Sequence, residues 1–246
     1  MNAISIPLLA TLLLILVNCE AQAAGNKSKA AAPSVQKKES TPKDGLLSLQ
    51  NAAAQGVAEA QYSLGWIYSK GEGLPKDTNK SFEWFQKAAA QGHTQAQFFL
   101  GVMYAKGEGI SRDSAKAIEW FLKAAAQGHA EAQFFLGVIY TYGEGVTKDI
   151  AKAIEWYQKA AAQGHAEAQY NLGWMYSNGE GVLKDAAKTF EWFQKAAVQG
   201  HAEAQYNLGL MYRDGEGVPK DAAKAIEWLK KAASQGHTKA QFLLNG

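Results

Sequence analysis

Apolar residues recur with a helical spacing from Leu46 to the end of the chain. In one representative stretch, Ala132, Leu136, Ile139 and Tyr140 follow steps of three and four residues, as on the buried face of an amphipathic helix. A Gly-Glu-Gly turn interrupts this stretch, and a second apolar face follows the turn. The pattern therefore predicts pairs of helices joined by short turns.

The pattern repeats every 36 residues. A period of this length is typical of stacked supersecondary units, each burying its apolar face against its neighbours. Glycines at one repeat position mark the period: Gly56, Gly92, Gly128, Gly164, Gly200 and Gly236. We predict repeats at 57–92, 93–128, 129–164, 165–200 and 201–236, between capping half-repeats at 45–56 and 237–246.

Each repeat is predicted to hold an A helix, running from about residue 131 to 141 in the third repeat, and a B helix that begins after Asp149. An aspartate at this position can accept hydrogen bonds from the free N–H groups of the first helical turn. Glu155 and Lys159 lie four residues apart in the order that stabilises an exposed helix face. The aspartate recurs as Asp77, Asp113, Asp185 and Asp221.

Every predicted A helix contains a glycine. A glycine inside a helix costs about 1 kcal/mol relative to alanine, so its recurrence predicts that a bulky ring of the B helix lies against the A backbone. The glycines are Gly65, Gly101, Gly137, Gly173 and Gly209. One tryptophan per B helix is predicted to belong to the core: Trp84, Trp120, Trp156, Trp192 and Trp228.

The N-terminal region predicts export. Residues 4–17 form an apolar run too short to span a bilayer, and Ala21-Gln22-Ala23 follows it, as in a signal peptide comprising residues 1–23. Residues 24–44 are rich in Ala, Lys, Ser and Pro, which predicts a disordered linker. We expect a periplasmic or secreted protein without a transmembrane helix in its mature form. The alternative is a lipoprotein anchored to the membrane at Cys19, because Leu16-Val17-Asn18-Cys19 resembles a lipoprotein box.

Composition excludes several functional classes. The chain carries 25 basic and 23 acidic residues, so it lacks the positive charge of a nucleic-acid-binding protein. Its single cysteine excludes an intramolecular disulfide and a cysteine-based zinc site. One Glu in each Gly-Glu-Gly turn supplies too few oxygens for calcium. We therefore predict no cofactor and no metal.

The five histidines occupy one repeat position. Equivalent residues of stacked helices lie about 8–10 Å apart, whereas zinc needs ligand nitrogens at about 2.0–2.1 Å. We therefore favour a role at the start of the A helices over a metal site. The histidines are His93, His129, His165, His201 and His237.

The repeats resemble the Sel-1-like family, which is related to tetratricopeptide repeats. The motif is Leu-Gly-x-x-Tyr, as in Leu172-Gly173 with Tyr176, then Gly-Glu-Gly, then Ala-x-x-Trp-x-x-x-Ala-Ala. The resemblance covers residues 45–244 and implies an all-α fold, a right-handed α-solenoid of antiparallel helix pairs with a concave groove. Exported bacterial relatives act as adaptors, regulators, effector-immunity proteins or host-facing binding proteins, which implies a protein or peptide partner.

By analogy with tetratricopeptide repeats, the groove is lined by matched positions of the A helices. An aromatic row is followed one turn later by a variable slot, and then by varying polar residues, which suits an extended peptide. The aromatic row has an alternative role in packing between repeats. The predicted partner-binding residues are Tyr62, Trp66, Lys70, Phe98, Val102, Phe134, Tyr142, Tyr170, Trp174, Asn178, Tyr206 and Arg213.

These observations favour a non-catalytic protein-interaction scaffold over an enzyme. The second hypothesis is an envelope hydrolase with weak penicillin-binding or β-lactamase-like activity. Ser34 and Lys37 form a Ser-x-x-Lys pattern, but this pattern lies in the predicted linker and we attribute it to chance. Neither Ser-Asp-Asn nor Lys-Thr-Gly accompanies this pattern. A third hypothesis, a regulator that binds a small ligand, needs a closed pocket that an open groove does not readily supply.

Overall fold

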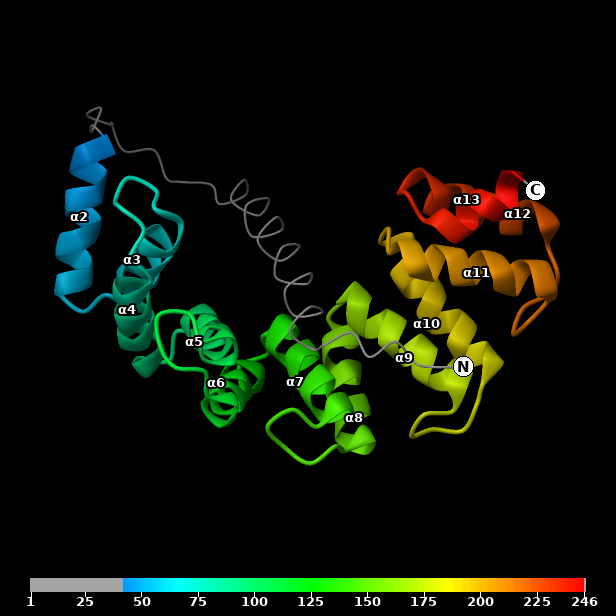
Figure 1. The fold of residues 1–246 in the computed structure, drawn as a ribbon, viewed down its shortest axis with the longest axis horizontal. Helices are drawn as coiled ribbons and strands as arrows, with labels where there is room; N and C mark the ends of the chain where they lie inside the picture. The colour runs from blue at the N-terminus through cyan, green and yellow to red at the C-terminus, as the bar shows by residue number, and fades with distance from the viewer. Residues whose placement is uncertain (1–41, 246) are drawn as a thin grey trace. The chain divides into compact units, whose positions relative to one another are not determined.

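A computed structural model describes residues 42–245, which form twelve α-helices and no strand (Figure 1). The predicted signal peptide, most of the predicted linker and Cys19 lie outside the described residues. The first helix, α2, begins at Pro42, slightly before the predicted capping half-repeat. The helices are α2 (Pro42–Ala54), α3 (Ala58–Lys70), α4 (Thr78–Ala90), α5 (Thr94–Lys106), α6 (Ser114–Ala126), α7 (Ala130–Tyr142), α8 (Ile150–Ala162), α9 (Ala166–Asn178), α10 (Ala186–Val198), α11 (Ala202–Asp214), α12 (Ala222–Ser234) and α13 (Thr238–Asn245).

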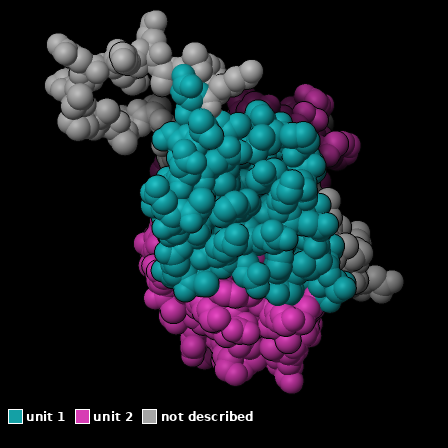
Figure 2. Space-filling view, turned by 90° about the vertical axis from the view of Figure 1, so that its left-hand side faces the viewer, with its two compact units in different colours: residues 1–93, 103–112 teal, residues 94–102, 113–246 magenta. Residues whose placement is uncertain are grey.

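Two compact units divide the chain, and Figure 2 distinguishes them by colour. Unit 1 contains residues 1–93 and 103–112, and unit 2 contains residues 94–102 and 113–246. Within each unit, consecutive helices pack as pairs, with α3, α5, α7, α9 and α11 as the A helices and α4, α6, α8, α10 and α12 as the B helices. Among the described residues, no helix combines the length and apolar character needed to cross a membrane.

The predicted start of the B helices is confirmed. In the third repeat, Asp149 has an extended backbone, and its side chain accepts a hydrogen bond of 3.0 Å from the backbone N–H of Lys152. The preceding A helix is capped by Gly143, whose N–H donates to the carbonyl of Ile139 and whose left-handed φ of 74° turns the chain out of the helix. Aspartate caps the other B helices in the same way, at Asp77, Asp113, Asp185 and Asp221.

The glycine inside each A helix lies against a bulky side chain of the paired B helix, as the sequence predicts. A Cβ atom on Gly137 would lie only 2.5 Å from Cδ1 of Tyr157, a residue that is 2% exposed. Rings occupy this place in four repeats, whereas the fifth repeat has a leucine. The other pairs are Gly65 with Phe85, Gly101 with Phe121, Gly173 with Phe193 and Gly209 with Leu229.

The repeated tryptophan lies at the edge of the core, where Trp84 and Trp228 pack against its buried residues, and is not the fully buried ring. Trp156 is half-buried, and the fully buried ring is that of the next residue, Tyr157. Consecutive helical residues point about 100° apart, so only one of the two can face the A helix. Lys159 Nζ lies 4.0 Å from the Trp156 ring centroid, and lysines cover the other four tryptophans in the same way.

Candidate functional site

The predicted groove residues of unit 1 lie along α3. Tyr62 and Trp66 are half-buried, and Lys70 is exposed at the end of the helix. Lys70 Nζ lies 5.0 Å from the Trp66 ring centroid, which allows a cation–π contact. An aromatic ring and a cation therefore lie together on this A helix.

In unit 2, three of the predicted groove residues are buried. Phe98, Val102 and Phe134 are at most 6% exposed, so their side chains contribute to packing and not to an open surface. Tyr170 and Tyr206 are half-buried. The predicted set thus divides into buried positions and a smaller number that solvent reaches.

The repeated aromatic row stacks on the histidine of the following repeat. Phe134 and His165 have ring centroids 4.6 Å apart and an angle of 16° between their planes. The row therefore has the packing role that the sequence left open as an alternative. The other stacked pairs, at 4.4–4.6 Å, are Tyr62 with His93, Phe98 with His129, Tyr170 with His201 and Tyr206 with His237.

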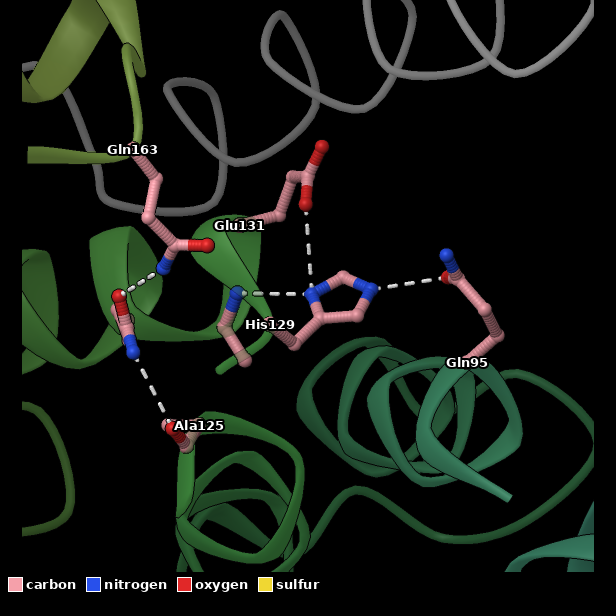
Figure 3. A network of polar contacts seen from close by, with 7 residues as sticks. Gln95, Ala125, His129, Glu131 and Gln163 are labelled. Carbon is pink, nitrogen blue, oxygen red and sulfur yellow. Dashed lines mark hydrogen bonds and ion pairs between the residues drawn. The ribbon is translucent and has the colours of Figure 1, made fainter. Parts of the chain in front are cut away.

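The histidines begin the A helices, as predicted. Nδ1 of His129 accepts a hydrogen bond of 3.2 Å from the backbone N–H of Ala132, and Nε2 lies 2.8 Å from Oε1 of Gln95 in the preceding repeat (Figure 3). An Nδ1 atom that accepts a hydrogen bond carries no proton, so Nε2–H is the donor and the ring is neutral. Burial lowers the pKa of His129 and also that of His165, which favours the neutral form.

A second row of contacts joins neighbouring repeats through glutamine. Nε2 of buried Gln133 donates to the carbonyl of Ala125 at 3.2 Å, and its Oε1 accepts from Nε2 of Gln163 at 2.8 Å (Figure 3). This network was not predicted, although the glutamines recur at fixed offsets in the sequence. The same amide-to-amide bond joins Gln91 to Gln61, Gln127 to Gln97, Gln199 to Gln169 and Gln235 to Gln205.

These contacts leave His129 and His201 poorly placed for acid–base chemistry. Both ring nitrogens of His129 and of His201 have hydrogen-bond partners, so neither offers a free lone pair to activate a nucleophile. In the described part of the chain, no three His, Cys, Asp or Glu residues gather closely enough to hold a metal ion. Ser34 and Lys37 of the Ser-x-x-Lys pattern lie outside the described residues.

Four predicted residues of unit 2 are exposed: Tyr142, Trp174, Asn178 and Arg213, which we call the exposed set. Tyr142 is 65% exposed and Trp174 is 44% exposed, whereas Val138, at the repeat position of Trp174, is 3% exposed. Asn178 Nδ2 donates to the Trp174 carbonyl at 2.9 Å. The exposed set thus combines aromatic area with polar groups, and it departs from the repeat pattern.

Arg213 forms a bidentate ion pair with its neighbour Asp214. Nε and Nη2 of Arg213 each donate to an Asp214 carboxylate oxygen at 2.8 Å. This pair raises the pKa of the arginine and lowers that of the aspartate, mainly through the side-chain hydrogen bond. Both side chains remain about half exposed, so the guanidinium face and edge stay accessible to a partner.

This architecture defines an α-helical repeat protein whose exposed side chains vary on a constant frame. The Sel1 repeat family model matches residues 58–93, 94–129, 130–165, 166–201 and 202–237. The chain therefore belongs to the Sel1 repeat family, whose fold is typical of protein–protein interaction scaffolds. The matched segments begin one residue later than the repeat frame used above.

Solved structures agree with this assignment. The chain is 41% identical to c5321, a protective antigen present in uropathogenic Escherichia coli strains, with a TM-score of 0.80. That match covers 82% of this chain but only 43% of c5321, so the chain spans less than half of that relative. A Sel1 repeat protein from Oxalobacter formigenes is 36% identical, with a TM-score of 0.73 and coverage of 83% and 82%. No curated protein gives a significant match.

Proposed function

We propose that this chain is an exported, non-catalytic scaffold that binds an extended segment of a partner protein through exposed side chains of its A helices. In unit 2 the contact residues are the exposed set. In unit 1, half-buried Trp66 and exposed Lys70 of α3 form a separate surface of the same kind. The observation that carries the proposal is the exposure of Trp174 at a position where other repeats bury a valine.

Exposed aromatic residues need an explanation because water does not favour their apolar area. A tryptophan at an interface can supply a large part of the binding energy, and tyrosine and arginine are also enriched among such anchors. The tryptophan is not required by the fold, because Val102 and Val138 fill the same slot in two other repeats. Nor does packing account for the phenol of Tyr142, which is mostly in solvent.

The polar members of the exposed set suit a peptide backbone. The Asn178 amide uses one N–H on its own helix, which leaves its carbonyl oxygen and a second N–H for a partner. Arg213 offers further donors beyond the two that bind Asp214. An extended peptide presents backbone N–H and C=O groups between its side chains, and donors and acceptors beside an aromatic anchor can bind these groups.

The first experiment identifies the partner by contact. A photo-crosslinking amino acid is placed at residue 142 or 174 of the full exported chain, and covalent products are identified by mass spectrometry. The same group at Leu183 serves as the control, because this residue is 90% exposed but lies in the loop between α9 and α10. A partner of the proposed surface crosslinks at residues 142 and 174 and not at residue 183.

Affinity for that partner then tests the energetic role. Trp174→Val introduces the residue that the second and third repeats carry in this slot, so we expect the variant to fold normally. Loss of an anchor should cost about 2 kcal/mol or more, which weakens binding roughly thirtyfold. Leu183→Ala should bind like the parent. Unchanged affinity in Trp174→Val and in Tyr142→Ala would refute the proposed surface.

A further inference from the structure

A histidine lies at each of the five junctions between repeats, but the residue that faces it differs in charge from one junction to another. Each histidine lies near the side chain found 34 residues earlier, in the preceding A helix. In the second junction this residue is Gln95, whose Oε1 lies 2.8 Å from His129 Nε2. Glutamate is the partner in three others, with His93–Glu59 at 3.0 Å, His201–Glu167 at 2.9 Å and His237–Glu203 at 3.1 Å.

Because residue 95 is glutamine, the carboxylate nearest to His129 comes from its own repeat and not from the preceding one. Oε2 of Glu131 lies 3.3 Å from Nδ1 of His129, within the same repeat (Figure 3). The negative charge of Glu131 also favours protonated His165, the histidine at the other boundary of this repeat. The carboxylate of Glu131 therefore favours the protonated form of both His129 and His165, and Glu167 adds a second negative charge near His165.

Protonation has different consequences at the two kinds of junction. At His129, His165, His201 and His237, Nδ1 accepts a hydrogen bond from the first turn of the A helix, so a proton on Nδ1 removes this cap. Where a glutamate faces Nε2, as Glu167 does at His201, a protonated ring would turn the existing hydrogen bond into an ion pair across the repeat boundary, which offsets the lost cap. At His129 the partner across the boundary is a neutral amide, so the new charge gains attraction only from Glu131 on its own helix and is repelled by charge on His165.

We propose that the junction between the second and third repeats, where Gln95 faces His129, is an acid-labile joint that loosens before the junctions built on glutamate. The side chain of His129 is 6% exposed, so water cannot readily solvate its charge there. Acidification would then free the start of α7 from α5 while the His201 junction stays closed.

The direction of the pH effect follows from burial. Desolvation, opposed by Glu131 and reinforced by His165, lowers the pKa of His129 below its ordinary value of 6.5. Stability from the neutral ring is therefore complete above about pH 6.5 and is lost as the pH falls through the lowered pKa. Each unit of lowering corresponds to about a tenfold change in the opening equilibrium.

Hydrogen exchange of the full chain at pH 7.5 and pH 5.0 tests this proposal. After correction for intrinsic exchange rates, amides in the first turn of α7 should exchange faster at pH 5.0, by about tenfold for each unit of pKa lowering. The first turn of α11, which is capped by His201, should change much less. The substitution Gln95→Glu should remove this difference, because it gives His129 the partner that His201 has.

Two further variants make the result specific. Gln158→Glu adds the same charge at an exposed position of α8 and should leave the acid response of α7 intact. His129→Asn keeps a capping residue without a titrating ring and should abolish the response. The proposal is overturned if α7 and α11 respond alike, if Gln95→Glu leaves the α7 response unchanged, or if His129→Asn retains it.

Discussion

Gly137 lies so close to the Tyr157 ring that a methyl group at residue 137 would overlap Cδ1 and Cε1, each 2.5 Å away. We therefore expect Gly137→Ala to destabilise the protein. Overpacking of a buried site costs about 1–3 kcal/mol, which outweighs the roughly 1 kcal/mol by which alanine favours a helix. Urea denaturation of the variant and parent measures the difference.

Gly209→Ala is the matched comparison for this prediction. Its neighbour is the Leu229 side chain, whose Cγ would lie 2.8 Å from the new methyl group and which adjusts more readily than a ring locked between helices. The loss should be smaller than for Gly137→Ala. A rise in stability on Gly137→Ala would mean that the ring is not held against the glycine.

The glutamine network predicts a large effect at Gln133. Gln133→Leu would leave the Ala125 carbonyl and the Gln163 amide without their partner, and an unpaired buried polar group costs about 1–3 kcal/mol. Gln163→Ala should cost less, because water can reach exposed residue 163. Denaturant unfolding of both variants and of their double mutant gives the coupling energy. Equal stability of Gln133→Leu and the parent would contradict the network.

Acid should weaken the aspartate cap of α8. Backbone hydrogen bonding from Lys152 lowers the pKa of Asp149 below 3.8, with the Lys152 side chain adding to the effect. The cap therefore stabilises α8 above about pH 3.8 and is lost as the pH falls through the lowered value. Asp149→Ala should lower the Tm at pH 7 and differ less from the parent at pH 2.

Asn is the control at this position, because its amide oxygen caps a helix but does not titrate. Asp149→Asn should stay near the parent at pH 7 and show no contribution from this site between pH 7 and pH 2. Thermal unfolding followed by circular dichroism measures all three proteins. A gap between Asp149→Ala and the parent that is the same at both pH values would argue against an ionised cap.

Processing of the N-terminus tests the export hypothesis. Mass spectrometry of the protein from the producing cell should give a mature chain that starts near Ala24, as the Ala-x-Ala pattern predicts. An acylated N-terminal Cys19 would replace the soluble form with the membrane-anchored alternative. Recovery of the uncleaved chain from the cytoplasm would contradict both forms of export.

Periodicity was sufficient to predict most of the fold. The 36-residue repeat placed the helix pairs, and capping chemistry placed the start of α8 after Asp149. The glycine of the A helix correctly indicated a bulky neighbour in the B helix. Periodicity did not distinguish Trp156 from Tyr157, because adjacent residues can both lie on a broad apolar arc and only the packed helices determine which one faces inward.

The candidate site was less predictable for a related reason. Residues at one repeat position occupy the same place in their helices but can differ in solvent exposure. Val138 is 3% exposed, whereas Trp174 is 44% exposed. The capping role of His129 followed from its position before the A helix. Its stacking on Phe98 and its contact with Gln95 depend on how successive A helices approach each other, which a period alone does not specify.

The glutamine network has a consequence for how the length of this chain can change. Gln133 takes its acceptor from the preceding repeat and its donor from its own, so the geometry depends only on offsets of fixed size. An in-frame deletion of residues 130–165 would bring Gln169 to the Ala125 carbonyl with Gln199 as its donor, in the same arrangement. Loss or duplication of 36 codons thus preserves the amide bonds between the repeats that are present. An insertion or deletion of another size inside a repeat would disrupt the bonds at that point.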